Sequence, residues 1–336
     1  MKDFDSIWRT QDEDGSWPEL FDELYVEYSS GRMFGTLNFT EYCEFSVRAD
    51  EKYHAVLEEA QRIHSVAWYI SMITDEDYMA KSCKFASEKV AKSCQKVLLD
   101  AHTHTVASGH AYSSLQEMAK AAADMGLEVL GITEHGPSVP GTCPTLYFKN
   151  MFVVPRRMYG IRLLMGCEIN ILDTKGSLDL TDEQMGWLDI AIAGVHAAWY
   201  QAGTKEENTQ GLVNVIRNPK IHIISHPGDG SCELDFEPLV LAAKEAHTLL
   251  EVNNHSLAPQ RHKTVARDNN LEILRLCKKY EVPTILGSDA HISFQIADYE
   301  RLYPLLAETD FPDELIMNYW PDKFFDYLQI TLQATY

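Results

Sequence analysis

The spacing of apolar residues changes near residue 97. Before that point apolar residues recur three and four positions apart, as in 56–70 and 79–94, which is the period of amphipathic helices. From residue 97, short β-branched and leucine-rich runs alternate with helical segments, a pattern typical of βα units around a parallel sheet. The pattern therefore predicts a mainly helical N-terminal region over 1–96 and an α/β region over 97–336.

The α/β region contains apolar runs of strand length. Seven strands are predicted, at 97–102, 128–135, 162–169, 189–196, 221–226, 248–254 and 283–289. Helices are predicted between them at 113–126, 236–247 and 270–281, and 312–330 has the character of a closing segment. In a parallel barrel the carboxyl ends of the strands meet on one face, where active sites are built.

Histidines and acids stand where these runs end. The candidate ligands are His102, His104, His110, His135, Glu168, His196, His226, Asp289 and His291. Only the run at 248–254 lacks one, because it ends in Asn253 and Asn254. Imidazoles combined with carboxylates suit zinc, manganese or iron, whereas an all-carboxylate set would favour magnesium or calcium. The pattern predicts a centre for several metal ions at one barrel mouth.

The prediction rests on the position of all nine residues at the ends of successive runs, because each residue alone is weak evidence. His102 and His104 are two residues apart, so at a strand end both side chains point to one face, and Asp289 and His291 repeat the spacing on the last strand. Glu168 ends an apolar strand, where an unpaired charge is costly to bury and where a carboxylate can bridge two cations. Single histidines of this kind are more often hydrogen-bonded core residues, but chance would not gather all of them at one end of successive strands. His222 is excluded, because it begins its strand about 13 Å from the position of His226.

Composition narrows the class of protein. With 336 residues and 45% apolar residues the chain can bury a large core, and a formal charge of −21 disfavours extended nucleic acid as a partner. Seven cysteines without a CxxC pair suit reduced thiols. The N-terminus has no basic and apolar leader and no run approaches 18 apolar residues, so we expect a cytoplasmic protein without a membrane contact.

The motifs as a set resemble the PHP family, named for polymerase and histidinol phosphatase. They are HTH at 102–104, His110, TEH, CEINI, GVH, ISHPG, EVNN and GSDAH. NTQ at 208–210, HIISHPG and the final FP-containing segment are most similar to the stand-alone bacterial phosphatases with a trinuclear zinc site. The resemblance covers about residues 97–330 and implies a distorted (β/α)7 barrel.

The resemblance also implies a ligand set for three divalent metal ions, zinc first, with manganese or iron as alternatives. It would put His102, His104, Glu168 and Asp289 on one ion, His196 and His226 on a second bridged by Glu168, and His110, His135 and His291 on a third. Residues 1–96 have no counterpart in the short family members, and His255 stands where a small residue is more usual.

The expected reaction is hydrolysis of a small phosphorylated substrate, most simply a phosphomonoester, by a metal-activated hydroxide. Glu168, Asp289 and His291 are the predicted catalytic residues, and GxSxG and P-loop signatures are absent. Arg156 and Arg261 are expected in active-face connections, where the planar arginine fork suits phosphate, and His255 is expected to line the substrate pocket.

Two alternatives remain at this point. An amidohydrolase-type barrel also opens with HxH and closes with a strand-end aspartate, although it usually carries a bridging lysine where this chain has Glu168. A noncatalytic, metal-stabilised interaction module would need only four ligands. For residues 1–96 we favour a helical cap over a lid, a regulatory domain or an oligomer interface.

Overall fold

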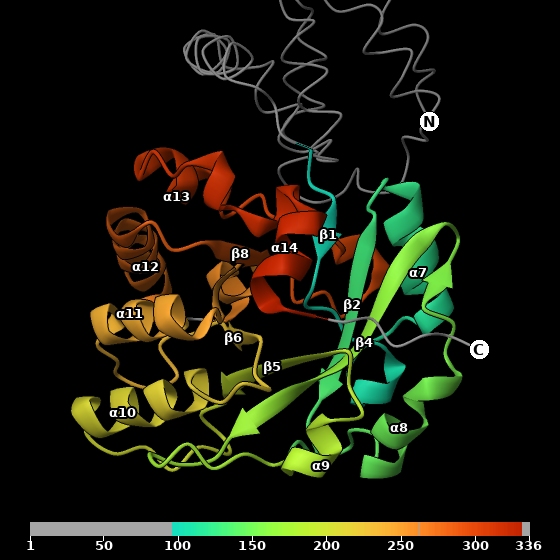
Figure 1. The fold of residues 1–336 in the computed structure, drawn as a ribbon, viewed down its shortest axis with the longest axis horizontal. Helices are drawn as coiled ribbons and strands as arrows, with labels where there is room; N and C mark the ends of the chain where they lie inside the picture. Colours follow the sequence, from blue (N-terminus) through green and yellow to red (C-terminus); the bar gives the residue numbers. More distant parts are fainter. Residues whose placement is uncertain (1–95, 262, 331–336) are drawn as a thin grey trace, which may run out of the picture. The chain divides into compact units, whose positions relative to one another are not determined.

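The computed structural model describes residues 96–261 and 263–330 (Figure 1). The helices predicted before residue 96 lie outside the described residues. Within the described part of the chain, no helix has the length and apolar character needed to cross a membrane.

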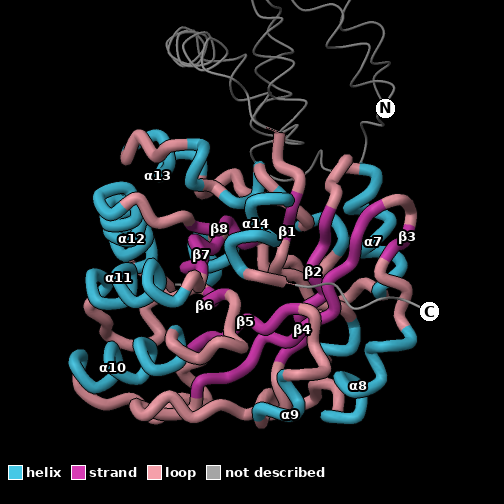
Figure 2. Tube along the Cα trace, in the orientation of Figure 1, coloured by secondary structure: helices cyan, strands magenta, loops and turns pink. Residues whose placement is uncertain are grey.

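The seven predicted strands are confirmed, and they form one parallel sheet in the order β1-β2-β4-β5-β6-β7-β8 (Figure 2). Their bounds are β1 Leu99–Asp100, β2 Val129–His135, β4 Ile161–Ile171, β5 Ile190–Val195, β6 Ile223–Ser225, β7 Leu249–Asn253 and β8 Thr284–Gly287. The sheet curls into a nearly closed, TIM-like barrel, which agrees with the distorted barrel implied by the resemblance.

One short strand was not predicted. β3, Arg157–Met158, pairs antiparallel with the start of β4 through a hairpin at Tyr159 and Gly160, which both have positive φ. Gly160 adopts this backbone without a steric penalty, and the two-residue turn is compatible with a tight hairpin. A strand of two residues is too short to leave a periodic signal in the sequence.

Helices cover the outside of the sheet (Figure 1). They are α7 Leu115–Asp124, α8 Thr145–Asn150, α9 Asp182–Met185, α10 Lys205–Ile216, α11 Phe236–Ala246, α12 Ala266–Tyr280, α13 Tyr303–Glu308 and α14 Pro321–Leu328. Several begin at sequence-encoded caps: Ser114 accepts from the Glu117 amide while the Glu117 side chain accepts from Ser114, and Thr204 and Glu207 do the same for α10. The helices predicted at 113–126, 236–247 and 270–281 correspond to α7, α11 and α12.

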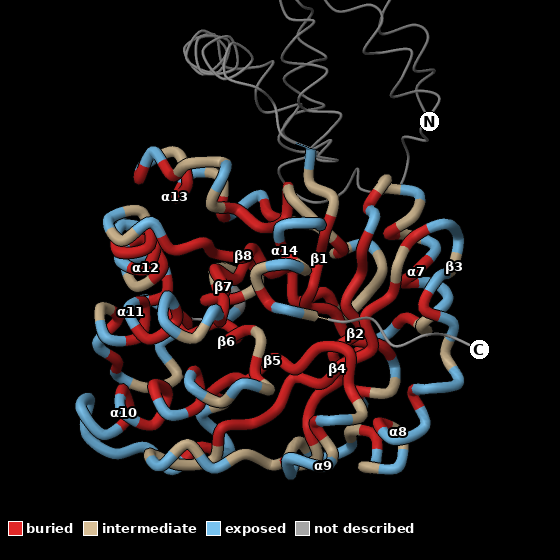
Figure 3. Tube along the Cα trace, viewed as in Figure 1, coloured by how far each residue is buried: buried red, intermediate tan, exposed pale blue. Residues whose placement is uncertain are grey.

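Two apolar cores follow from the alternation of side chains along the strands. On β4, Met165 and Cys167 point outward into the core shared with the helices, whereas Leu164 points into the barrel. The inner core is closed at the amino ends of the strands by Phe324 and Leu328 of α14. The strands of the sheet consist almost entirely of buried residues, drawn in red in Figure 3. The polar side chains described below occupy the opposite, carboxyl ends of the strands.

The seam between β1 and β8 is closed without a regular ladder. Thr103 and Ala290 form one isolated parallel bridge. Below it, the buried side chain of Asn318 in the closing segment accepts from the Leu286 amide at 2.7 Å and donates to the carbonyls of Leu286 and Leu99 at 2.8 and 3.0 Å. The Asn318 carboxamide therefore takes the place of the missing ladder hydrogen bonds between the first and last strands.

Candidate metal centre

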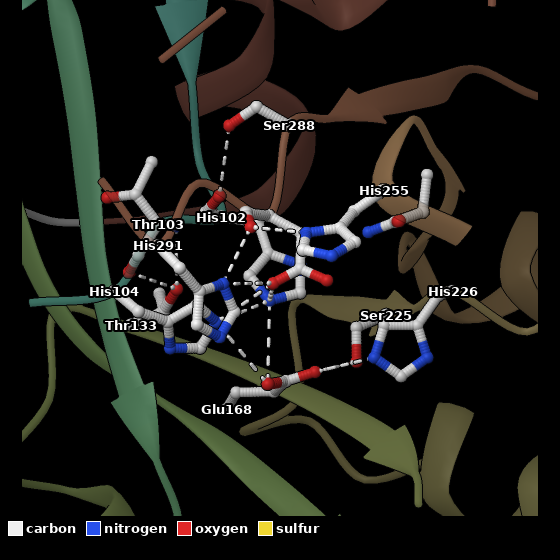
Figure 4. Close-up of polar contacts among 12 residues, drawn as sticks. His102, Thr103, His104, Thr133, Glu168, Ser225, His226, His255, Ser288 and His291 are labelled. Atoms are coloured by element: carbon white, nitrogen blue, oxygen red, sulfur yellow. Dashed lines mark hydrogen bonds and ion pairs between the residues drawn. The ribbon is translucent and has the colours of Figure 1, made fainter. Parts of the chain in front are cut away.

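The Glu168 carboxylate contacts histidines on one side and Ser225 and His226 on the other (Figure 4). Glu168 is two residues beyond Gly166 and four beyond Leu164 on β4, so it shares their face and points into the barrel. Its Oε1 lies 2.8 Å from His226 Nε2 and 3.3 Å from His196 Nε2. These two histidines follow β6 and β5, the strands next along the sheet from β4.

The second carboxylate oxygen of Glu168 faces a different set of histidines. Oε2 lies 2.9 Å from His135 Nδ1, 3.5 Å from His102 Nε2 and 3.6 Å from His104 Nε2. His135 ends β2, and the other two follow β1. The carboxylate thus stands between two groups of imidazoles.

Asp289 completes the group around the first strand. Its Oδ1 lies 3.2 Å from His104 Nε2 and 3.6 Å from His102 Nε2, and the two imidazole nitrogens are themselves 3.1 Å apart. Asp289 has a φ of 54°, an uncommon conformation for a residue other than glycine. Backbone strain of this kind persists where the surrounding structure fixes it, and it is frequent at functional sites.

A third group of imidazoles lies toward the outside. His110 Nε2 is 3.2 Å from His135 Nε2 and 3.2 Å from His291 Nε2. His110 is exposed, whereas His135 is buried and His291 is half-buried. The structure therefore brings all nine predicted ligands together at the carboxyl ends of the strands.

The donor set fits divalent metal ions. Ligand atoms converge within 4.8 Å of one another in groups that include His102, His104 and Glu168, and His135, Glu168 and His196. Glu168 Oε2 and His135 Nδ1 are buried and lie 2.9 Å apart, yet they form no well-aligned hydrogen bond, and neither has another hydrogen-bond partner among the described residues. Buried polar atoms without a partner are costly, and a bound cation would satisfy both.

Glu251 is a residue of the site that was not predicted. This buried carboxylate on β7 accepts from His102 Nδ1 at 2.7 Å, from the His226 amide at 2.7 Å and from Asn253 Nδ2 at 3.1 Å. A carboxylate that binds the far nitrogen of a ligand histidine fixes its tautomer and leaves Nε2 free for the metal. A charged residue inside the apolar run TLLEVNN is the signal that could have identified it.

Further polar side chains orient other histidines. Asn170 Oδ1 lies 2.7 Å from His196 Nδ1, so this nitrogen donates and Nε2 is left to face Glu168. His104 Nδ1 lies 3.2 Å from Ser108 Oγ, which donates to Glu134 at 2.6 Å. The tautomers of these rings are therefore set by the fold.

Two glycines allow the close approach of these groups. A Cβ on Gly194 would lie 2.2 Å from Ser225 Oγ, which donates to Glu168 Oε1 at 2.9 Å. A Cβ on Gly287 would overlap the carboxylate of Glu251. Any side chain at either position would displace groups of the site.

The carboxylates and imidazoles shift one another's pKa. Burial alone would lower the pKa of His102, but Glu251, Glu168 and Asp289 outweigh it and hold this pKa well above its usual range. Burial opposes ionisation of Glu168 and Asp289 too, yet the histidines around them keep both pKa values well below the usual range. The buried carboxylates thus favour positive charge beside them, either as protonated histidine or as a bound cation.

The three predicted substrate-binding residues differ in position. Arg156 lies on the outer face of the sheet, where its Nε contacts Asp189 at 2.6 Å and its Nη1 donates to the Met151 and Val154 carbonyls. Contrary to expectation it lies away from the strand-end cluster, because it precedes β4 instead of following it.

The other two lie on the active face. His255 follows β7, and its ring lies 5.6 Å from that of His291. Burial lowers the pKa of His255, the negative charge of Asp289 opposes this shift, and the positive charge of the exposed Arg261 adds to it. A substrate contact by Arg261 or His255 stays a prediction.

Comparison with known proteins agrees with the geometry. The PHP domain family model matches residues 100–254. A probable phosphatase from Clostridium novyi is 46% identical over 234 residues, which cover 70% of this chain and 95% of the relative, and one from Acetivibrio thermocellus is 43% identical over 234 residues, covering 70% and 96%. The solved histidinol phosphate phosphatase from Lactococcus lactis, complexed with zinc, L-histidinol and phosphate, is 20% identical, with 64% of this chain and 95% of that chain covered and a TM-score of 0.42. Identity of this extent over almost the whole length of the relatives, together with the nine converging side chains, shows that the chain belongs to the PHP family.

Proposed function

We propose that the protein is a metal-dependent phosphatase that hydrolyses small phosphomonoesters at a centre of three divalent ions. The observation that supports this proposal most directly is that the two carboxylate oxygens of Glu168 face different histidines. Oε1 faces His196 and His226, whereas Oε2 faces the histidines that follow β1 and end β2. One carboxylate between two imidazole groups is suited to hold two cations at a fixed separation. The relatives named as probable phosphatases support the same class of reaction.

The nine side chains divide into three ligand groups in this proposal. The first ion would be held by His102, His104, Asp289 and Glu168, the second by Glu168, His196 and His226, and the third by His110, His135 and His291. Zinc is the first expectation, because a set of seven imidazoles and two carboxylates matches its preference.

When bound, such ions lower the pKa of a coordinated water and polarise phosphoryl oxygens. The chain would supply the positioning: Glu168 would contribute one oxygen to each of two ions, and Glu251 and Asn170 hold His102 and His196 with Nε2 facing inward. Arg261 is the candidate for contact with the substrate phosphate, since its exposed guanidinium stays near the barrel mouth. An amidohydrolase-type reaction gains no support, because the central bridging position is Glu168 and the chain is a PHP protein.

The test combines metal analysis with a phosphate-release screen over phosphomonoesters, phosphodiesters and cyclic nucleotides. We expect two or more ions per chain and release from a monoester at neutral to alkaline pH. Glu168→Gln should lose most activity and metal without unfolding, since the amide cannot bridge two cations. Glu272→Gln on the exposed face of α12 is the matched control. Fewer than two ions with no release from any ester would refute the proposal, and wild-type rates in Glu168→Gln would refute the bridging role.

A further inference from the structure

His255 lies just after β7, the one parallel strand for which the sequence predicted no metal ligand. Six of the seven parallel strands end in a predicted ligand, and β7 ends in Asn253 followed by Asn254 and His255. His255 is placed by a defined turn, because Asn253 Oδ1 accepts from the Ser256 amide at 2.8 Å and from its hydroxyl at 3.1 Å. The ring is half-buried and points toward the cluster in Figure 4.

The backbone carbonyl of Asp289 fixes the same tautomer in two histidine rings. The Asp289 carbonyl lies 2.9 Å from His291 Nδ1 and 3.2 Å from His255 Nδ1, so both rings donate from Nδ1. A carbonyl oxygen has two lone pairs and can accept both bonds. In this tautomer a neutral ring presents Nε2 as the acceptor, which is the form that a metal ligand requires. His291 uses this nitrogen toward His110, as described above.

The spacing of His255 also matches that of the predicted ligands. Its ring centroid lies 5.6 Å from that of His291, and the recorded ring pairs among the predicted ligands lie between 4.1 and 6.0 Å apart. A ring nitrogen of His255, a ring nitrogen of His291 and a carboxylate oxygen of Asp289 lie within 4.8 Å of one another, as do the corresponding atoms of His102, His104 and Glu168.

We propose that His255 is a tenth metal ligand, which binds through Nε2 in the part of the centre formed by Asp289 and His291. This inference rests on the proposed metal-dependent function and gives His255 a role different from lining the substrate pocket. A tenth ligand at the outer edge would retain an ion that otherwise depends on the exposed His110. All seven parallel strands would then contribute to the metal centre.

The test uses His255→Asn in the full-length protein. The asparagine amide can replace Nδ1 as donor to the Asp289 carbonyl but offers nothing at the position of Nε2, so it separates the hydrogen bond from the metal contact. His247→Asn is the matched control, because His247 is an exposed histidine at the C-terminal cap of α11 with a φ of 56°, which asparagine tolerates.

Zinc per chain is measured after dialysis against a weak chelator, and affinity by chelator competition, in wild type and both variants. We expect His255→Asn to lose about one ion per chain or to bind it at least about tenfold more weakly, with His247→Asn unchanged. Unchanged zinc content and affinity would overturn the proposal, whether the Michaelis constant for a phosphomonoester rises or not. If His255→Asn does not fold by circular dichroism, His255→Gln is measured in its place, with the same two outcomes. Because the readout is metal and not turnover, a wild-type protein that binds its ions but releases no phosphate would refute the phosphatase reaction alone.

Discussion

Replacing Asn318 by alanine should open the seam of the barrel. Asn318 is fully buried and takes part in three short hydrogen bonds with β1 and β8, one from the Leu286 amide and two to the carbonyls of Leu99 and Leu286. A typical buried hydrogen bond contributes about 1 kcal/mol, and an amide left buried without a partner costs about 1–3 kcal/mol. The Asn318→Ala variant loses the bonds to two carbonyls and leaves the Leu286 amide without a partner. Together these losses should lower its unfolding free energy by about 3–5 kcal/mol.

The seam lies directly below the ligands of the first and last strands. His102 and His104 follow β1, Asp289 and His291 follow β8, and the His102 carbonyl accepts from the Asp289 amide at 3.1 Å. If Asn318 sets the distance between these strands, its loss should also weaken metal binding. A purely peripheral residue would leave metal binding unchanged.

Two measurements check this reasoning. Urea unfolding gives the change in free energy, and hydrogen exchange of a peptide covering β8 reports whether the Leu286 amide loses protection. Asn318→Leu, which fills the volume without the hydrogen bonds, should lose nearly as much stability, whereas Asn214→Ala on the exposed face of α10 should lose little. A loss below about 1 kcal/mol with unchanged exchange at Leu286 would refute the role of Asn318 as the closure of the seam.

Three further predictions concern the site and its surroundings. Glu251→Gln should weaken zinc binding about 10–100-fold without unfolding, because glutamine is neutral and has one acceptor oxygen, whereas Glu251 uses two, toward His102 and toward the His226 amide; affinity equal to wild type in a chelator competition would contradict this. Burial lowers the pKa of His222 to about 4, and its Nδ1 accepts from the Ala191 amide, so the folded protein keeps this ring neutral while the unfolded chain protonates it below about 6.5. The unfolded state then binds more protons, so stability should fall as pH drops from about 6.5 to about 4, by at most about 3 kcal/mol, and His222→Asn should show a flatter dependence in urea unfolding at each pH. Gly194→Ala should lower both the midpoint of thermal unfolding and the zinc content, because the new Cβ would lie 2.2 Å from Ser225 Oγ. A midpoint within about 1 °C of that of the wild type would contradict the steric argument.

Local patterns in the sequence were sufficient for most of the fold. The period of two in strands and of 3.6 in helices depends only on which positions face the core, so the seven parallel strands and α7, α11 and α12 could be predicted. β3 could not, since two residues carry no period. Arg156 was misplaced because it lies in the long connection between β2 and β4, and the sequence does not show which part of that connection stays near the carboxyl end of β2.

The candidate ligands were also determined by the sequence, because parallel strands bring their carboxyl ends to one face whatever the details of packing. The sequence alone did not decide which histidines face which oxygen of Glu168, or that Glu251 and Asn318 support the site from distant parts of the chain. Those relations join residues many positions apart, and they depend on how the barrel closes and on the rotamer of each side chain. Residue type and strand order thus specified the candidate metal centre, while the tertiary structure set the geometry of its side chains and placed His255 beside Asp289 and His291.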